Sequence, residues 1–203
     1  GSEETRPVDR REIRDQITGD GPICVYIGGR VLGRGLKNQI RALTYLPDVR
    51  LVMIGSGGTY FDKELMTLAQ QEKVEDRVFI LPSVPASHLL DWISTADIGL
   101  TTIEPVCLSY RYSLPNKIFQ YAMAGIPVLA SDLPDMAALV EEYGLGSVCD
   151  PEDPVSIAKQ IKGILSGDIV ATTDEKREAF RSAFSWSAQR EILKGVYADL
   201  GVL

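Results

Sequence analysis

Short apolar runs alternate with amphipathic segments along most of this 203-residue chain. Six continuous apolar runs are typical of strands covered on both faces, and they span residues 23–27, 51–54, 78–81, 98–101, 128–130 and 147–149. The segments between them carry apolar side chains at helical spacing, as at Leu36, Ile40 and Leu43, which predicts helices with one buried face. These helices are expected from about residue 36, from about 62, over 87–94, after 115, near 135–142 and from 154.

Repeated strand-helix units predict a parallel sheet, because parallel strands need crossover connections and these are usually right-handed helices. The predicted fold class is α/β: a single-domain, Rossmann-like, doubly wound parallel sheet of about six strands, with C-terminal helices. In such sheets ligands bind beyond the carboxyl ends of the strands. A functional site is therefore expected in the loops that follow the predicted strands.

The chain divides into three predicted segments. Residues 1–20 are charged and weakly patterned, and they are interpreted as an interdomain linker. The first two residues, Gly-Ser, resemble the remnant of a removed tag, so the chain is expected to be a piece of a longer protein. Residues 21–170 form the predicted Rossmann-like domain, and residues 171–203 form a C-terminal helical segment that could pack away from the sheet.

The amino-acid composition argues against some classes of function. The net charge of −7 argues against a nucleic-acid partner, because neutralising phosphates requires a basic face. No run approaches the roughly 20 apolar residues of a membrane-spanning helix, and no signal peptide opens the sequence. A cytoplasmic location is expected, with any peripheral contact at the inner face of the membrane made by regions outside this chain. Two of the three cysteines fall in apolar strand-like runs, which fits buried thiols in a reducing compartment, and the absence of CxxC spacing gives no indication of a metal site.

The first candidate loop reads Gly28-Gly29-Arg30-Val31-Leu32-Gly33-Arg34-Gly35. Glycines let the backbone approach a ligand closely, and the guanidinium groups of Arg30 and Arg34 can each donate a fork of hydrogen bonds to phosphate oxygens. The spacing matches neither the P-loop nor the dinucleotide-binding G-x-G-x-x-G motif. The alternative interpretation is a structural turn whose arginines are solvated.

Two further loops follow predicted strands. Gly55-Ser56-Gly57-Gly58 separates a strand from a helix, as nucleotide-binding loops do, although such turns also occur in sheets without ligands. Leu81-Pro82-Ser83-Val84-Pro85 is stiffened by two prolines and could present backbone groups to a planar base. His88, the only histidine, has no evident serine, cysteine or aspartate dyad, so it is interpreted as a surface residue.

The fourth segment runs from Ser113 to Ala130 and reads as a loop, a helix N-terminus, an amphipathic helix, a glycine stop and a buried strand. A helix N-terminus offers free N–H groups and a partial positive charge, which suit an anionic ligand. Lys117 can help to hold a diphosphate, and Gln120, one turn further on, can reach a sugar hydroxyl with its amide. The alternative is a helix on which both polar side chains are solvated.

In their order, these loops resemble the C-terminal domain of a group 1, family 4 glycosyltransferase of the GT-B fold. The resemblance spans residues 21–200 and is carried by Tyr26-Ile27-Gly28-Gly29-Arg30, Arg34-Gly35, Val52-Met53-Ile54-Gly55-Ser56-Gly57, Pro115-Asn116-Lys117-Ile118-Phe119 and Tyr121-Ala122-Met123-Ala124-Gly125-Ile126-Pro127-Val128. It implies that this domain binds a nucleotide-sugar donor, a UDP- or GDP-sugar, and that a separate N-terminal domain binds the acceptor, which is a glycan, a lipid or another molecule. It further implies a retaining, metal-independent transferase without a cofactor, inactive as an isolated domain, whose C-terminal helices cross back to the N-terminal half.

The resemblance also assigns site residues. Arg30, Arg34 and Lys117 are expected to face the diphosphate and to stabilise the charge that builds on it as the sugar bond breaks. The residues expected to bind the rest of the nucleotide sugar are Gly28, Gly29, Gly57, Ser83, Val84, Leu114, Asn116 and Gln120.

Two departures from the family pattern leave other functions open. The family often carries two glutamates where this chain has Tyr112 and Gln120. A glutamine can hydrogen-bond a ribose but is not an anionic acceptor, and Glu104 in the same loop is a candidate substitute. The alternatives are a non-catalytic interaction domain with a degenerate donor site and a sugar-nucleotide epimerase.

Overall fold

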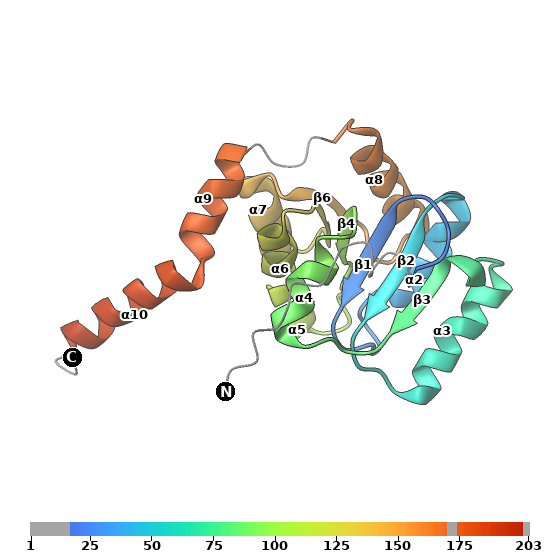
Figure 1. The fold of residues 1–203 in the computed structure, drawn as a ribbon, viewed down its shortest axis with the longest axis horizontal. Helices are drawn as coiled ribbons and strands as arrows, with labels where there is room; N and C mark the ends of the chain where they lie inside the picture. The colour runs from blue at the N-terminus through green and yellow to red at the C-terminus, as the bar shows by residue number, and fades with distance from the viewer. Residues whose placement is uncertain (1–16, 170–173, 201–203) are drawn as a thin grey trace.

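The structure, a computed structural model, describes residues 17–169 and 174–200. In this part of the chain six strands form one sheet in the spatial order β3-β2-β1-β4-β5-β6 (Figure 1). Every neighbouring pair is parallel, which confirms the predicted Rossmann-like α/β class. The strands are β1 (Ile23–Ile27), β2 (Arg50–Ile54), β3 (Val78–Leu81), β4 (Ile98–Thr101), β5 (Val128–Ser131) and β6 (Gly146–Cys149).

Helices cover both faces of the sheet (Figure 1). One face packs against α2 (Leu36–Ala42), α3 (Thr59–Gln71) and α8 (Pro154–Ser166). The other packs against α4 (Ala86–Ile93), α6 (Asn116–Ala124), α7 (Pro134–Tyr143) and α9 (Asp174–Phe184). Three shorter helices complete the connections: η1 (Leu43–Tyr45), η2 (Glu75–Arg77) and α5 (Leu108–Arg111).

The two-sided packing explains why the strands read as continuous apolar runs. Successive side chains of a strand point to opposite faces of the sheet. In β1, Cys24 and Tyr26 join the core beneath α2, α3 and α8, whereas Ile23, Val25 and Ile27 join the core beneath α4, α6 and α7. A polar residue at any of these positions would lie in one core or the other.

Two helices differ from the sequence-based prediction. Helix α3 begins at Thr59 rather than at about residue 62, because its N-cap is Gly58 in an extended conformation. Helix α5 was not predicted, since its single turn is too short to show a helical period.

The ends of the described chain pack differently. Ile17 is buried, and its carbonyl accepts a hydrogen bond from the Arg50 guanidinium at 3.1 Å, so the chain is already packed on the domain where the description begins. Helix α9 packs on α6 and α7 and buries Phe180. Helix α10 (Trp186–Asp199) runs on from α9 away from the sheet (Figure 1). It leaves apolar side chains such as Trp186 exposed. Within the described residues, no helix has both the length and the apolar character needed to span a membrane.

Candidate functional site

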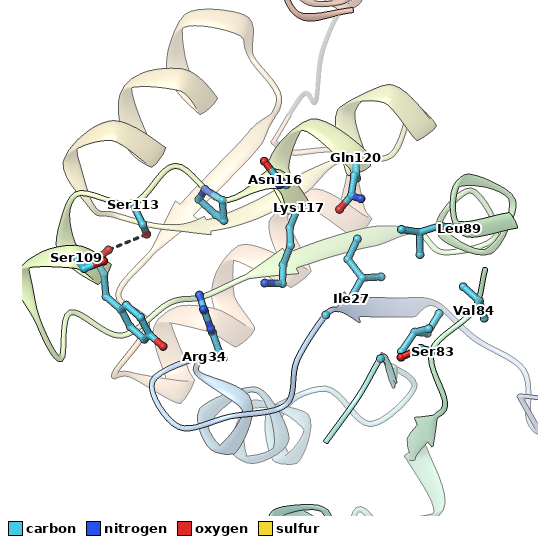
Figure 2. Close-up of a pocket in the computed structure, with 15 residues that line it drawn as sticks. Ile27, Arg34, Ser83, Val84, Leu89, Ser109, Ser113, Asn116, Lys117 and Gln120 are labelled. Carbon is cyan, nitrogen blue, oxygen red and sulfur yellow. Dashed lines mark hydrogen bonds between the residues drawn. The ribbon is translucent and has the colours of Figure 1, made fainter. Parts of the chain in front are cut away.

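A cavity of about 560 Å³ opens beyond the carboxyl ends of β1, β2 and β3 and is closed on its other side by the residues that follow β4 (Figure 2). The strand order reverses between β1 and β4, so the cavity lies at the topological switch point, where sheets of this kind bind ligands. Its volume falls in the range of small-molecule sites.

The buried Tyr121 bridges the ends of β1 and β4 at this point of the sheet. The Tyr121 hydroxyl, on α6, accepts a hydrogen bond from the Ile27 backbone N–H at 3.1 Å and donates one to the Leu100 carbonyl at 3.1 Å. The ring lies on Gly99, where a Cβ atom would come within 2.2 Å of it. Tyr121 therefore replaces direct pairing between the ends of β1 and β4 and fixes α6 at the edge of the cavity.

Two glycines bring the strand ends close together beneath a lysine. Gly28 (φ 115°) and Gly55 (φ 147°) adopt backbone conformations that favour glycine, and a Cβ on Gly55 would lie 2.1 Å from the Gly28 carbonyl oxygen. A Cβ on Gly28 would lie 3.1 Å from Cε of Lys117. The absence of side chains at these positions gives Lys117 its place in the cavity.

Two cations enter the cavity from different elements. Figure 2 shows Lys117 reaching down from α6 and Arg34 reaching up from the loop between β1 and α2. The Lys117 ammonium lies 5.0 Å from the ring centre of Tyr26, and the Arg34 guanidinium carbon lies 4.6 Å from that of Tyr110. Burial, together with the positive charge of Arg34, lowers the pKa of Lys117 to about 8.

Nothing acidic neutralises these cations within the part of the chain that the structure describes. Neither Arg34 nor Lys117 forms an ion pair with a carboxylate there. The first turn of α6 contains no acidic residue, and no side chain caps it. Two cations and a helix N-terminus thus meet in one cavity, an arrangement that favours an anionic ligand.

Arg30 lies outside the cavity and is paired with Asp62. Its side chain is 5% exposed, and Asp62 on α3 accepts hydrogen bonds from its Nε at 2.7 Å and its Nη2 at 2.8 Å. Its Nη1 donates to the Gly55 carbonyl at 2.7 Å and to the Leu81 carbonyl at 3.3 Å. The Arg30 hydrogen bond holds the pKa of Asp62 below its usual range. Arg30 ties α3 to the ends of β2 and β3 and does not line the cavity.

The structure brings part of the predicted site together. The predicted residues that line the cavity are Gly28, Arg34, Ser83, Val84, Asn116, Lys117 and Gln120. Those it does not bring to the lining are Gly29, Arg30, Gly57 and Leu114. Gly57 packs against the Arg30–Asp62 pair, and the Gly29 carbonyl accepts a hydrogen bond from the Tyr26 hydroxyl at 2.6 Å.

The cavity is also lined by residues that the sequence analysis did not assign to the site, although some of them lie in the loops it singled out. They are Ile27, Ile54, Gly55, Leu89, Ser109, Tyr110, Ser113 and Pro115. Their positions at or after the ends of β1, β2, β3 and β4 could have indicated that they belong to the site. Leu89 and Tyr110, however, lie on helices, and only the packing of those helices determines which of their side chains face the cavity.

Of the residues considered in place of the family's glutamates, Tyr112 and Glu104 lie away from the cavity, whereas Gln120 lines it. Tyr112 is exposed and does not line it. Glu104 accepts a hydrogen bond from Asn38 at 3.3 Å outside the cavity, and burial and the charge of Glu152 raise its pKa. Gln120 lines the cavity one turn after Lys117, and Asn116, the other amide side chain of α6, lines it at the start of the helix (Figure 2).

The fold and the cavity define a Rossmann-like domain with an electropositive cavity at the switch point of its sheet. The chain belongs to the group 1 glycosyltransferases, because the family described as "Glycosyl transferases group 1" matches residues 9–184. This result confirms the family resemblance based on the strand-end loops.

Individual relatives agree with this family. The D-inositol 3-phosphate glycosyltransferase of Xylanimonas cellulosilytica is 29% identical over 184 residues, which are 89% of this chain and 43% of that protein. The chain spans less than half the length of the curated relatives it matches.

Solved structures share the fold. Anabaena HepE, crystallised with UDP and glucose, is 20% identical with a TM-score of 0.77 over 96% of this chain and 53% of that one. The C-terminal domain of the group 1 protein LpcC from Francisella tularensis is 14% identical with a TM-score of 0.69, and the match covers 87% of this chain and 93% of that one.

Proposed function

We propose that this chain is the donor-binding domain of a glycosyltransferase and that its cavity binds the diphosphate of a nucleotide sugar. The observation that carries the proposal is the pair formed by Arg34 and Lys117, which line one cavity without a carboxylate partner in the described residues. A diphosphate supplies the missing negative charge. Membership of the group 1 family and the UDP-bound state of HepE support a nucleotide sugar as its source.

The same cations would assist sugar transfer. The bond between the anomeric carbon and the diphosphate oxygen breaks, and its electron pair remains on the diphosphate. The acceptor hydroxyl oxygen forms the new bond to the sugar, and its proton passes to an oxygen of the departing diphosphate. In this proposal Arg34, Lys117 and the N-terminus of α6, which line the cavity, stabilise the charge that develops on the leaving diphosphate. Retention of anomeric configuration is proposed from the family resemblance.

The rest of the cavity would hold the nucleoside. Ser83 and Val84, after β3, line the end of the cavity away from Ser109 and Ser113 (Figure 2), where a base could pack against the loop. Gln120 lies one turn after Lys117 and could accept or donate a hydrogen bond to a ribose hydroxyl. UDP and GDP are the proposed nucleotides.

The acceptor is proposed to bind a second domain that this chain does not contain. The relatives are more than twice as long as the matched part, which leaves room for such a domain. The exposed apolar side chains of α10 are proposed to pack on it, with residues 21–170 as the donor domain and 171–203 as the segment that crosses back. The isolated chain should then bind a donor without transferring its sugar.

Calorimetric titration of the chain with UDP, GDP and ADP at millimolar concentration tests the proposal. At least one diphosphate should bind, and Arg34→Ala should weaken that binding by roughly tenfold or more, since a charge-assisted hydrogen bond is lost. Arg41→Ala, on the exposed side of α2, is the matched control and should leave the affinity unchanged. Absence of heat with all three diphosphates would contradict the proposal and favour a domain whose donor site is degenerate.

A further inference from the structure

Both cations of the cavity lie against tyrosine rings. The Lys117 ammonium is 5.0 Å from the centre of the Tyr26 ring, and the Arg34 guanidinium carbon is 4.6 Å from the centre of the Tyr110 ring. Both distances are within the roughly 6 Å over which a ring face attracts a cation. The two tyrosines come from different elements, since Tyr26 lies in β1 and Tyr110 in α5.

Each ring is itself held in place. Tyr26 is fully buried, and its hydroxyl donates a hydrogen bond to the Gly29 carbonyl at 2.6 Å. Tyr110 lies against Gly33 (φ 77°), where a Cβ atom would come within 2.7 Å of its ring, and its carbonyl accepts a hydrogen bond from the Ser113 hydroxyl at 2.8 Å. The Tyr26 hydroxyl bond and the packing of Tyr110 on Gly33 therefore fix where each ring meets its cationic side chain.

We propose that Tyr26 and Tyr110 are positioning residues that hold Lys117 and Arg34 in the cavity without neutralising their charge. This inference rests on the proposed function, because it assumes that the cations bind a diphosphate. A carboxylate could hold them equally well, but it would compete with the phosphate oxygens. A tyrosine ring attracts the cation through its quadrupole and leaves the full positive charge available.

The ring contacts also offset the electrostatic repulsion between Arg34 and Lys117. Arg34 and Lys117 are close enough for the charge of Arg34 to lower the pKa of Lys117. Without an anion, two such side chains would separate into solvent unless something attracted both of them. The ring contacts keep them together in the cavity, so less ordering is needed when a diphosphate binds.

Tyr110→Leu tests the proposal, with binding measured for the tightest of UDP, GDP and ADP and for its parent nucleoside. The variant should weaken diphosphate binding roughly fivefold, which corresponds to one cation–ring contact, and should leave nucleoside binding unchanged. Tyr110→Phe keeps the ring and should bind like the wild type. In an Arg34→Ala background, Tyr110→Leu should have no further effect, because Tyr110 acts through Arg34.

Equal weakening of diphosphate and nucleoside, or a full fivefold effect that persists without Arg34, would overturn the proposal. A second measurement needs no substitution. In NMR spectra of the wild-type chain, the side-chain protons near the Arg34 guanidinium and the Lys117 ammonium should be shifted upfield by the tyrosine rings. Random-coil shifts would overturn the proposal even if a diphosphate binds, whereas upfield shifts without any diphosphate binding would contradict only the proposed function.

Discussion

The carboxylate of Asp62 holds the guanidinium of Arg30 through two hydrogen bonds of 2.7 and 2.8 Å. A buried guanidinium with this bidentate partner and two backbone acceptors already uses four of its five N–H donors within the protein. We therefore expect Arg30 to stabilise the strand-end loops around the cavity, and we expect Arg34 to provide the arginine contact to a diphosphate.

Arg30→Met should lower the free energy of unfolding by about 3 kcal/mol, because it leaves Asp62 and the Gly55 carbonyl without their donor. Urea denaturation followed by circular dichroism measures this change. Arg41→Met is the matched control and should alter the free energy of unfolding by less than about 0.5 kcal/mol, since Arg41 is exposed and its carboxylate partner lies at 3.8 Å. A variant of wild-type stability that no longer binds a diphosphate would instead place Arg30 in the binding site.

Tyr121→Phe should destabilise the domain by about 1–3 kcal/mol, because the Ile27 N–H loses its acceptor in a buried position. The change removes one oxygen atom and leaves the ring on Gly99 in place. Tyr112→Phe removes the same atom from an exposed ring and serves as the control. Equal melting temperatures of the two variants would argue against a role for Tyr121 in bridging the ends of β1 and β4.

The affinity for a nucleoside diphosphate should fall as the pH rises through about 8, where Lys117 loses its proton in the free protein. Below this pH the ammonium is charged and attracts the diphosphate; above it, binding must first recover a proton. Between pH 7 and pH 9.5 the affinity should fall by roughly tenfold. Lys117→Arg keeps its charge over this range and should give a flat profile, which isolates the contribution of Lys117. A flat wild-type profile would contradict the assignment.

Gln120→Ala should weaken binding of a nucleoside diphosphate by about fivefold, the effect of one lost hydrogen bond to the ribose. Binding of inorganic diphosphate, which has no ribose, should be unchanged. Gln70→Ala, at an exposed position of α3, controls for the loss of an amide elsewhere. If Gln120→Ala weakens both ligands equally, Gln120 contacts the phosphates or the fold rather than the sugar.

The strands and most helices could be predicted because their signals are local. The buried runs and the 3.6-residue spacing of Leu36, Ile40 and Leu43 each lie within a few residues. Lys117 and Gln120 could be expected to lie together because they occupy the first two turns of a helix that the sequence indicates. The end of a parallel strand and the start of the next helix are determined by local sequence patterns, so both can be predicted from the sequence.

The partners of the cationic side chains could not be predicted in this way. Arg30 and Asp62 are 32 positions apart in the chain, and only the packing of α3 beside β2 and β3 brings them together. The same holds for Lys117 over Tyr26 and Arg34 over Tyr110. Sequence patterns therefore identified several basic residues, but they did not distinguish a solvated, a paired and a cavity-facing cation.

The most direct test is a crystal structure of this chain with the tightest binder among UDP, GDP and ADP. The account predicts that the diphosphate lies within hydrogen-bond distance of the Arg34 guanidinium and the Lys117 ammonium, at the N-terminus of α6, with Arg30 still bound to Asp62. A diphosphate bound outside this cavity, or one that draws Arg30 away from Asp62, would contradict it.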